Sequence, residues 1–187
     1  MGAPLKFPTT TEAVQNLLKQ IGIDGIRYEE IFIASYDGPM PQLHKHLGEY
    51  ESIDELNHLA CLLSELNEYE LEVFEAVMDS GEYTGSVKDL INLAQNLDSY
   101  NFYSDIHTEE ELGRMYIQEL EAVQVPEHLI DYIDYEAYGR DVRINEDGHL
   151  APGGYVVGGG SFVEHYHGIE DIPDEHRVFS MPKVPIR

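Results

Sequence analysis

Two sets of carboxylates recur in this chain at the spacing of a helical face. The first set consists of Glu68, Glu72, Glu75 and Asp79, and the second consists of Glu127, Asp131 and Asp134. Neighbours within each set are three or four residues apart, which places their side chains within roughly 60° of one another around a helix. A row of carboxylates has the charge and hydrogen-bonding capacity to pair with Lys and Arg side chains of a partner.

The acidic residues of the chain are segregated. Between Gly48 and Gly139 there are 23 acidic side chains and only two basic ones, Lys88 and Arg114, whereas residues 1–47 hold five acidic and four basic residues. Adaptation to high salt is the rival explanation, but it would spread acids evenly. Because a one-sided charge repels the compact state, the segregation favours a functional polyanionic surface. At one charge per ~1.7 Å of B-DNA, the net charge of −25 matches about 42 Å of duplex, or roughly 12 base pairs.

Two pairs of histidines are the motifs in this sequence that most resemble part of a metal site. His44 with His46, and His165 with His167, are each two residues apart, which places both imidazoles on one side of an extended segment. Two ligands do not make a zinc site, and Cys61 lies in a leucine-rich stretch that indicates a buried core position. We therefore expect no metal and no cofactor.

Catalytic patterns are weak in this sequence. Cys61 and His58 are three residues apart, but the apolar neighbours of the thiol favour packing over nucleophilic chemistry. The glycine-rich stretch 153–160 lacks both the Lys-Ser/Thr pair and the following helix of a phosphate-binding loop. Paired carboxylates also leave a hydrolase open as an alternative. We expect a protein that is not an enzyme.

Hydrophobic periodicity predicts an α+β fold made of three pieces. Residues 1–50 form an α+β domain, 51–106 a helical central domain and 107–187 a second α+β domain. Helices are predicted from the run Thr9–Thr11 to Ile21, from Ser52 to Leu66, from Asn67 to Asp79, after Ser86, after Thr108 and from Pro126 to Gly139. Short strands are predicted at 30–36, 155–157 and 161–163, with a hairpin turn at 145–148.

Composition also bears on where the chain acts. A single cysteine excludes an intramolecular disulfide, and no apolar run approaches the ~18 residues of a membrane span. Anionic lipid and nucleic acid would both be repelled by the acidic surface. We expect a soluble, cytoplasmic protein that binds neither a membrane nor nucleic acid directly.

Several short motifs, in their order and spacing, resemble the ArdA family of antirestriction proteins, which are carried by conjugative plasmids and transposons. These motifs are Ser52–Asn57, Asp89–Leu93, Asn96–Asp98, Glu111–Gly113 and Tyr132–Asp141. The resemblance covers the chain from about Phe7 to Ile172. Family members begin with a further strand and loop, so the resemblance implies that the N-terminal domain is incomplete here.

The resemblance implies an elongated, dimeric protein of three domains that imitates bent B-form DNA. Such a protein inhibits type I restriction-modification enzymes by occupying their DNA-binding cleft. The acidic segment of the family corresponds to Glu127, Asp131, Asp134, Glu136 and Asp141 here, which would stand in for phosphates. The alternative from another class is an acidic protein-interaction module whose basic partner is unrelated to DNA restriction.

Overall fold

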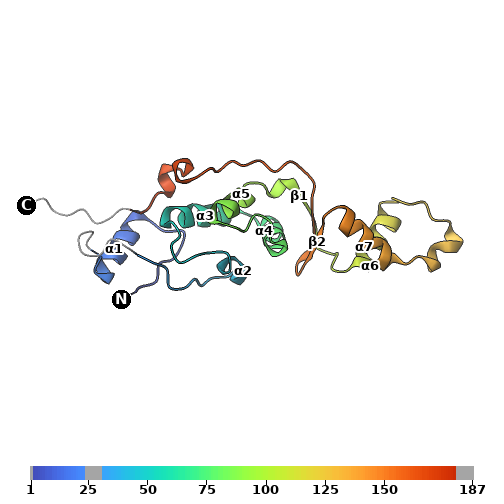
Figure 1. Cartoon of the computed structure of the whole chain (residues 1–187), viewed down its shortest axis with the longest axis horizontal. Helices are drawn as coiled ribbons and strands as arrows, with labels where there is room; N and C mark the ends of the chain where they lie inside the picture. Colours follow the sequence, from blue (N-terminus) through green and yellow to red (C-terminus); the bar gives the residue numbers. More distant parts are fainter. Residues whose placement is uncertain (1, 24–30, 180–187) are drawn as a thin grey trace, which may run out of the picture. The chain divides into compact units, whose positions relative to one another are not determined.

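The computed structural model describes residues 2–23 and 31–179 and divides the chain into two compact units. Unit 1 comprises residues 1–67, 83–95 and 163–187, and unit 2 comprises residues 68–82 and 96–162. Each unit is therefore assembled from segments that are distant in the sequence, as the colours of Figure 1 show. The central piece predicted at 51–106 contributes to both units, and the division into three domains stays a prediction.

Unit 1 consists of helices and irregular segments. Its helices are α1 (Thr11–Ile21), α2 (Pro41–His44), α3 (Ile53–Glu65) and α5 (Val87–Ala94), with 3₁₀ turns η4 (Ile169–Asp171) and η5 (Asp174–His176). The predicted starts of three helices are confirmed, because the hydroxyls of Thr10, Ser52 and Ser86 accept hydrogen bonds from backbone N–H groups of the first turns.

Two apolar contacts organise unit 1. Val14 and Leu18 on α1 are buried against Val178, and α3 packs on α5. The C-terminal strap, which we define as residues 163–179, has no α-helix or strand and lies in the same unit as α3 and α5. Its backbone must therefore find hydrogen-bond partners outside regular secondary structure.

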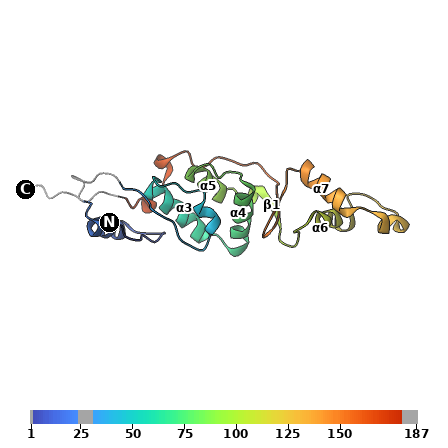
Figure 2. The same ribbon diagram turned by 60° about the horizontal axis from the view of Figure 1, so that its bottom comes forward.

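Unit 2 combines helices with a small sheet. Its elements are α4 (Glu68–Ser80), the 3₁₀ turn η1 (Leu97–Ser99), β1 (Tyr100–Tyr103), α6 (Glu109–Arg114), the π-helical turn η2 (Met115–Glu119), the 3₁₀ helix η3 (Glu127–Tyr132), α7 (Tyr135–Asn145), β2 (His149–Ala151) and β3 (Gly154–Gly158). The strand order is β1-β3-β2 and both pairings are antiparallel, with Tyr103 opposite Tyr155 and Ala151 opposite Gly154. Helix α4 contacts β2 and β3 and lies beside the sheet in Figure 2. Together with unit 1, these elements confirm a mixed helical and sheet fold.

Helices α6 and α7 cross at unusually short range and lie side by side in Figures 1 and 2. A Cβ atom on Gly113 would stand 2.0 Å from the carbonyl oxygen of Tyr135, and one on Gly139 would stand 1.8 Å from that of Glu109. Because these obstacles are backbone atoms, only glycine fits at either position. The predicted capping box at the start of α6 is confirmed, with Thr108 and Glu111 each bonding the backbone of the other.

Two predicted strands are wrong within the described residues. Residues 31–36 form no strand, although the Ile33 N–H donates to the Glu49 carbonyl at 2.7 Å; residue 30 lies outside the described part. Residues 161–163 are also irregular, and the Ser161 carbonyl accepts from the Ser99 hydroxyl. The strand predicted at 155–157 is confirmed as the centre of β3.

The helix predicted from Pro126 to Gly139 is wrong, because the chain forms two elements there. Helix η3 ends before Ile133, whose backbone is extended, and α7 begins after Asp134. Glu127 and Asp131 therefore lie in a 3₁₀ helix, whereas Asp134 caps the next helix, so the three do not form one helical row. The predicted hairpin at 145–148 instead connects α7 to β2, with Asp147 at a φ of 55°.

Candidate functional site

The first predicted carboxylate set lies on the outer side of α4. We call Glu68, Glu72, Glu75 and Asp79 the α4 acidic face; all four are exposed. The face forms because Val73, Phe74 and Val77 are buried on the opposite side of the helix. Asp79 is the one member with a protein partner among the described residues, since its Oδ2 lies 2.8 Å from Nε2 of His149 on β2.

The second acidic surface surrounds the junction of η3 and α7. We call Glu127, Asp131, Asp134, Glu136 and Asp141 the 127–141 acidic segment; all five are exposed. Asp134 accepts a hydrogen bond from the Ala137 N–H at 3.0 Å and so caps α7. Within residues 2–23 and 31–179, no hydrogen bond or ion pair to a protein group engages the other four carboxylates.

Both acidic surfaces belong to unit 2, where positive charge is scarce. Unit 2 contains 20 acidic and three basic residues, a net charge of −17. Two of the three arginines are already paired, Arg114 with Glu110 at 2.7 Å and Arg143 with Glu109 at 2.9 Å. Within residues 2–23 and 31–179, the carboxylates of the two acidic surfaces form no ion pair with a Lys or Arg side chain.

Other carboxylates of unit 2 serve the fold. The pKa of Glu111 lies below its usual range because the His107 N–H donates to the carboxylate and the Thr108 side chain and N–H add further bonds. Glu146 accepts hydrogen bonds from the hydroxyls of Tyr116 and Tyr155. Burial, together with the nearby Glu146 carboxylate, raises the pKa of both tyrosines. The acidic residues of unit 2 thus divide into those that hold the fold and those left facing solvent.

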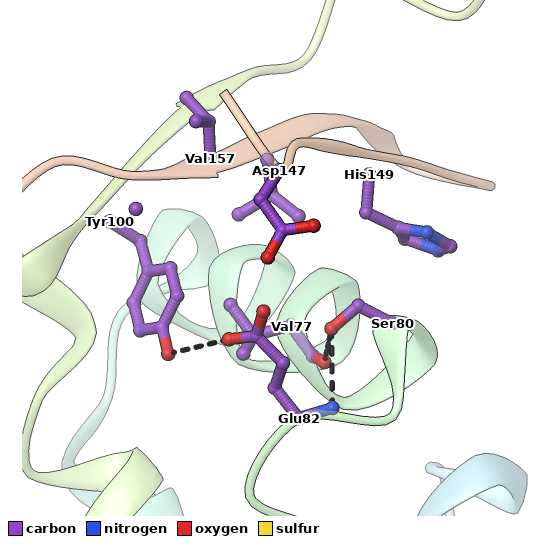
Figure 3. A pocket seen from close by; sticks show the side chains of 9 residues that line it. Val77, Ser80, Glu82, Tyr100, Asp147, His149 and Val157 are labelled. Atoms are coloured by element: carbon purple, nitrogen blue, oxygen red, sulfur yellow. Dashed lines mark hydrogen bonds between the residues drawn. The ribbon is translucent and has the colours of Figure 1, made fainter. Parts of the chain in front are cut away.

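Two carboxylates converge at a small hollow in unit 2. Glu82 and Asp147 point toward one another between the end of α4 and the sheet (Figure 3), and the Tyr100 hydroxyl donates to Glu82 at 3.4 Å. The cavity volume is ≈ 10 Å³, enough for about one water molecule. Substrate pockets typically occupy about 300–1,000 Å³, so this hollow does not accommodate a substrate.

The remaining sequence candidates do not assemble into a site. His44 ends α2 and His46 follows it, so these two residues do not form an extended pair. Among the residues that the structure describes, no group of three or more His, Cys, Asp and Glu side chains is arranged to hold a metal ion. Within the same ranges, the helices lack the combination of length and apolar character that a membrane span requires.

Cys61 and His58 do not act on each other. Cys61 is half-buried on α3, more exposed than the sequence predicts, and burial raises the pKa of its thiol, with Glu65 adding to the effect. Such a thiol is a poor nucleophile at neutral pH. The His58 imidazole bonds to His176 instead.

A family model described as antirestriction protein (ArdA) matches residues 1–157. The chain belongs to the ArdA family. No curated protein matches it. The match includes unit 2 as far as residue 157, and therefore both acidic surfaces. Membership of the family implies an antirestriction role for the ArdA chain.

The ArdA chain carries further exposed carboxylates in unit 2 that sequence reasoning did not select. Among them are Asp98, Asp105, Glu119 and Glu121. Glu119 ends the π-helical turn and Glu121 has a φ of 49°, so neither belongs to a regular helical row. A search for helical spacing misses such residues, whereas the local excess of acids over bases would have found them.

Proposed function

We propose that this chain inhibits type I restriction-modification enzymes by placing the acidic surfaces of unit 2 in their DNA-binding cleft, as a mimic of B-form DNA. The single observation that carries the proposal is the set of nine exposed carboxylates on a unit of net charge −17. Membership of the ArdA family supports the antirestriction role. The three-domain organisation that the resemblance implies is part of the same proposal.

The charge of unit 2 suits a short duplex. At one charge per ~1.7 Å of B-DNA, 17 net charges correspond to about 29 Å, or roughly eight to nine base pairs. In this proposal, the α4 acidic face and the 127–141 acidic segment stand in for backbone phosphates and pair with Lys and Arg of the enzyme. The summed field also steers the two proteins together.

The proposed activity is stoichiometric inhibition, and the chain is not an enzyme. It requires no metal or nucleotide, binds no nucleic acid directly and acts in the cytoplasm in support of transferred plasmids or transposons. Full inhibitory potency after exhaustive chelation is the expected result, and a loss of potency that zinc restores would contradict it.

We propose further that two copies associate. Large apolar side chains are exposed beside the 127–141 acidic segment, with Leu120 56%, Leu129 43% and Tyr132 83% exposed. Their removal from water would favour a protein contact there. Light scattering of the purified chain measures the mass directly, and a monomer at micromolar concentration would contradict the homodimer.

Competition with duplex DNA tests the mimic. Increasing amounts of the chain should protect unmethylated DNA from a type I enzyme, and added duplex should restore cleavage. Raising salt from about 50 to 200 mM should weaken protection, because the Debye length shortens to about 7 Å. An acidic module that binds a basic partner unrelated to DNA would give no protection, and a chain whose protection ignores both salt and competitor would not be a DNA mimic.

A further inference from the structure

The C-terminal strap is held by side chains of α3 and α5. On α5, the buried Asn92 accepts from the N–H groups of His165 and Tyr166 at 2.8 and 2.9 Å, and its amide donates to the Tyr166 carbonyl at 2.7 Å. The Tyr166 side chain is 1% exposed. One asparagine thus replaces the backbone partner that a neighbouring strand would provide.

Helix α3 holds the far end of the strap in the same way. Asp54 accepts from the N–H groups of Val178 and Phe179, both at 2.7 Å. Asn57 is 1% exposed and donates to the His176 carbonyl at 3.0 Å. Because the strap has no α-helix or strand of its own, these side-chain bonds and the burial of Tyr166 and Val178 keep it on the helices.

His58 and His176 meet between these attachment points. Their Nδ1 atoms are 2.8 Å apart and their ring centroids 5.0 Å apart. A hydrogen bond at this distance needs one protonated and one unprotonated nitrogen. If both nitrogens carried a proton, two N–H groups would point at each other and two positive rings would stand in contact.

In the described part of the chain, no carboxylate is bonded to His58 to balance a second proton. The ring is 4% exposed and lies 5.7 Å from the Tyr166 ring. Burial lowers the pKa of His58 and the neighbouring His176 lowers it further. Within the described residues, no hydrogen bond or ion pair joins a carboxylate to either imidazole.

The charged groups on the elements around the pair have other partners or face solvent. On α3, Asp54 binds the strap backbone, Glu55 accepts from the Tyr166 hydroxyl at 2.8 Å, and Cys61 is a half-buried thiol. On α5, Lys88 pairs with Glu164 of the strap. The other ionisable groups of the strap near His176 are Asp174, Glu175 and Arg177, all exposed. Arg177 donates to the Ile172 carbonyl.

We propose that the His58–His176 contact is a pH-sensitive clasp that holds the C-terminal strap on α3 and releases it when both imidazoles become protonated. The ordinary pKa of a solvent-exposed histidine is about 6.5. The closed form excludes the second proton, so release takes up protons. Strap attachment is therefore complete above that pH and weakens as the pH falls below it, by up to about tenfold per pH unit for each proton taken up.

Hydrogen exchange of the strap amides tests the clasp in the full-length chain. The reporters are the N–H groups of Tyr166, Val178 and Phe179, and those of Val156 and Val157 in β3 serve as a reference. Between pH 6.5 and 5.5, and after correction for intrinsic rates, strap protection should fall about tenfold while the β3 amides keep theirs. This range lies above the ordinary titration of carboxyl groups.

Two variants separate the clasp from general acid effects. H58Q/H176Q retains a side-chain hydrogen bond without a titrating group, and its strap protection should not change over this range. H165Q removes an exposed strap histidine outside the clasp and should behave as the wild type.

If the double variant fails to fold, the NMR resonances of the imidazoles in the wild-type chain report their protonation directly. One of the two histidines should then stay neutral until the strap is released. Independent titration of both near 6.5 with constant strap protection would overturn the proposal, as would simultaneous loss of protection throughout unit 1.

Discussion

Unit 1 carries a net charge of −8 on 105 residues, whereas unit 2 carries −17 on 82. In unit 1, carboxylates such as Asp54 and Asp171 accept backbone N–H bonds and hold irregular chain. In unit 2, three of the four carboxylates of the α4 acidic face (all but Asp79) and four of the five of the 127–141 acidic segment (all but Asp134) bind nothing else in the described protein. The same functional group therefore builds structure in one unit and remains available to a partner in the other.

The largest effect is expected on stability, at the crossing of α6 and α7. Helix α7 carries part of the acidic surface of unit 2. In Gly139→Ala the new methyl group would stand 1.8 Å from the Glu109 carbonyl oxygen and 2.7 Å from the Gly113 nitrogen. Helices α6 and α7 would have to separate, and we expect a loss of about 3 kcal/mol in the free energy of unfolding. Urea denaturation measures it.

Gly158→Ala is the matched control, because nothing lies within 4 Å of its added methyl group. It should cost less than about 1 kcal/mol, the usual penalty range for an exchange without a clash. Equal stabilities of the two variants would contradict the close crossing of α6 and α7.

Neutralising three carboxylates on each unit compares them directly. E127Q/D131N/D134N keeps an asparagine cap on α7 and removes three exposed charges from unit 2, while D37N/E49Q/E175Q removes three exposed charges from unit 1. Each exposed pair is worth roughly 0.2–1 kcal/mol. The unit 2 variant should therefore inhibit a type I enzyme about tenfold less well, and the unit 1 variant should lose less than about twofold. Equal losses would mean that overall charge matters and its location does not.

An effect on stability, and not on inhibition, is expected from Glu146, the carboxylate that unit 2 uses internally. Y116F/Y155F removes both hydroxyls that donate to the half-buried Glu146. Leaving a buried acceptor unsatisfied costs about 1–3 kcal/mol, so thermal or urea unfolding should show a loss near 2 kcal/mol. Tyr132 is 83% exposed, and Tyr132→Phe should leave stability unchanged. A double variant as stable as the wild type would show that water molecules replace the two hydroxyls as hydrogen-bond donors to Glu146.

The smallest effect is expected from one charge of the 127–141 acidic segment. Asp131→Asn removes a single exposed carboxylate and should weaken inhibition by less than about 1 kcal/mol, because exposed pairs are individually weak. Titration of the inhibitor against a fixed amount of enzyme measures this shift. Complete loss of inhibition from this one substitution would indicate a specific pocket in place of a collective field.

Local sequence patterns determined the helix starts and the exposure of the α4 acidic face. Thr10, Ser52 and Thr108 cap helices because their hydroxyls reach backbone N–H groups only a few residues away. Glu68, Glu72 and Glu75 face solvent because the apolar residues on the opposite side of α4, Val73, Phe74 and Val77, are buried. The charge imbalance is likewise a property of the sequence alone.

Contacts between distant residues decided the rest. The row expected from Glu127 to Asp134 is interrupted because the chain leaves the helix at Ile133 and starts α7 at Tyr135, where Gly113 and Gly139 allow two backbones to touch. The strap has no periodic pattern, because its backbone is satisfied by the side chains of Asp54, Asn57 and Asn92. Periodicity reports which side of one element is apolar, whereas only the tertiary structure reveals which distant polar groups a segment meets.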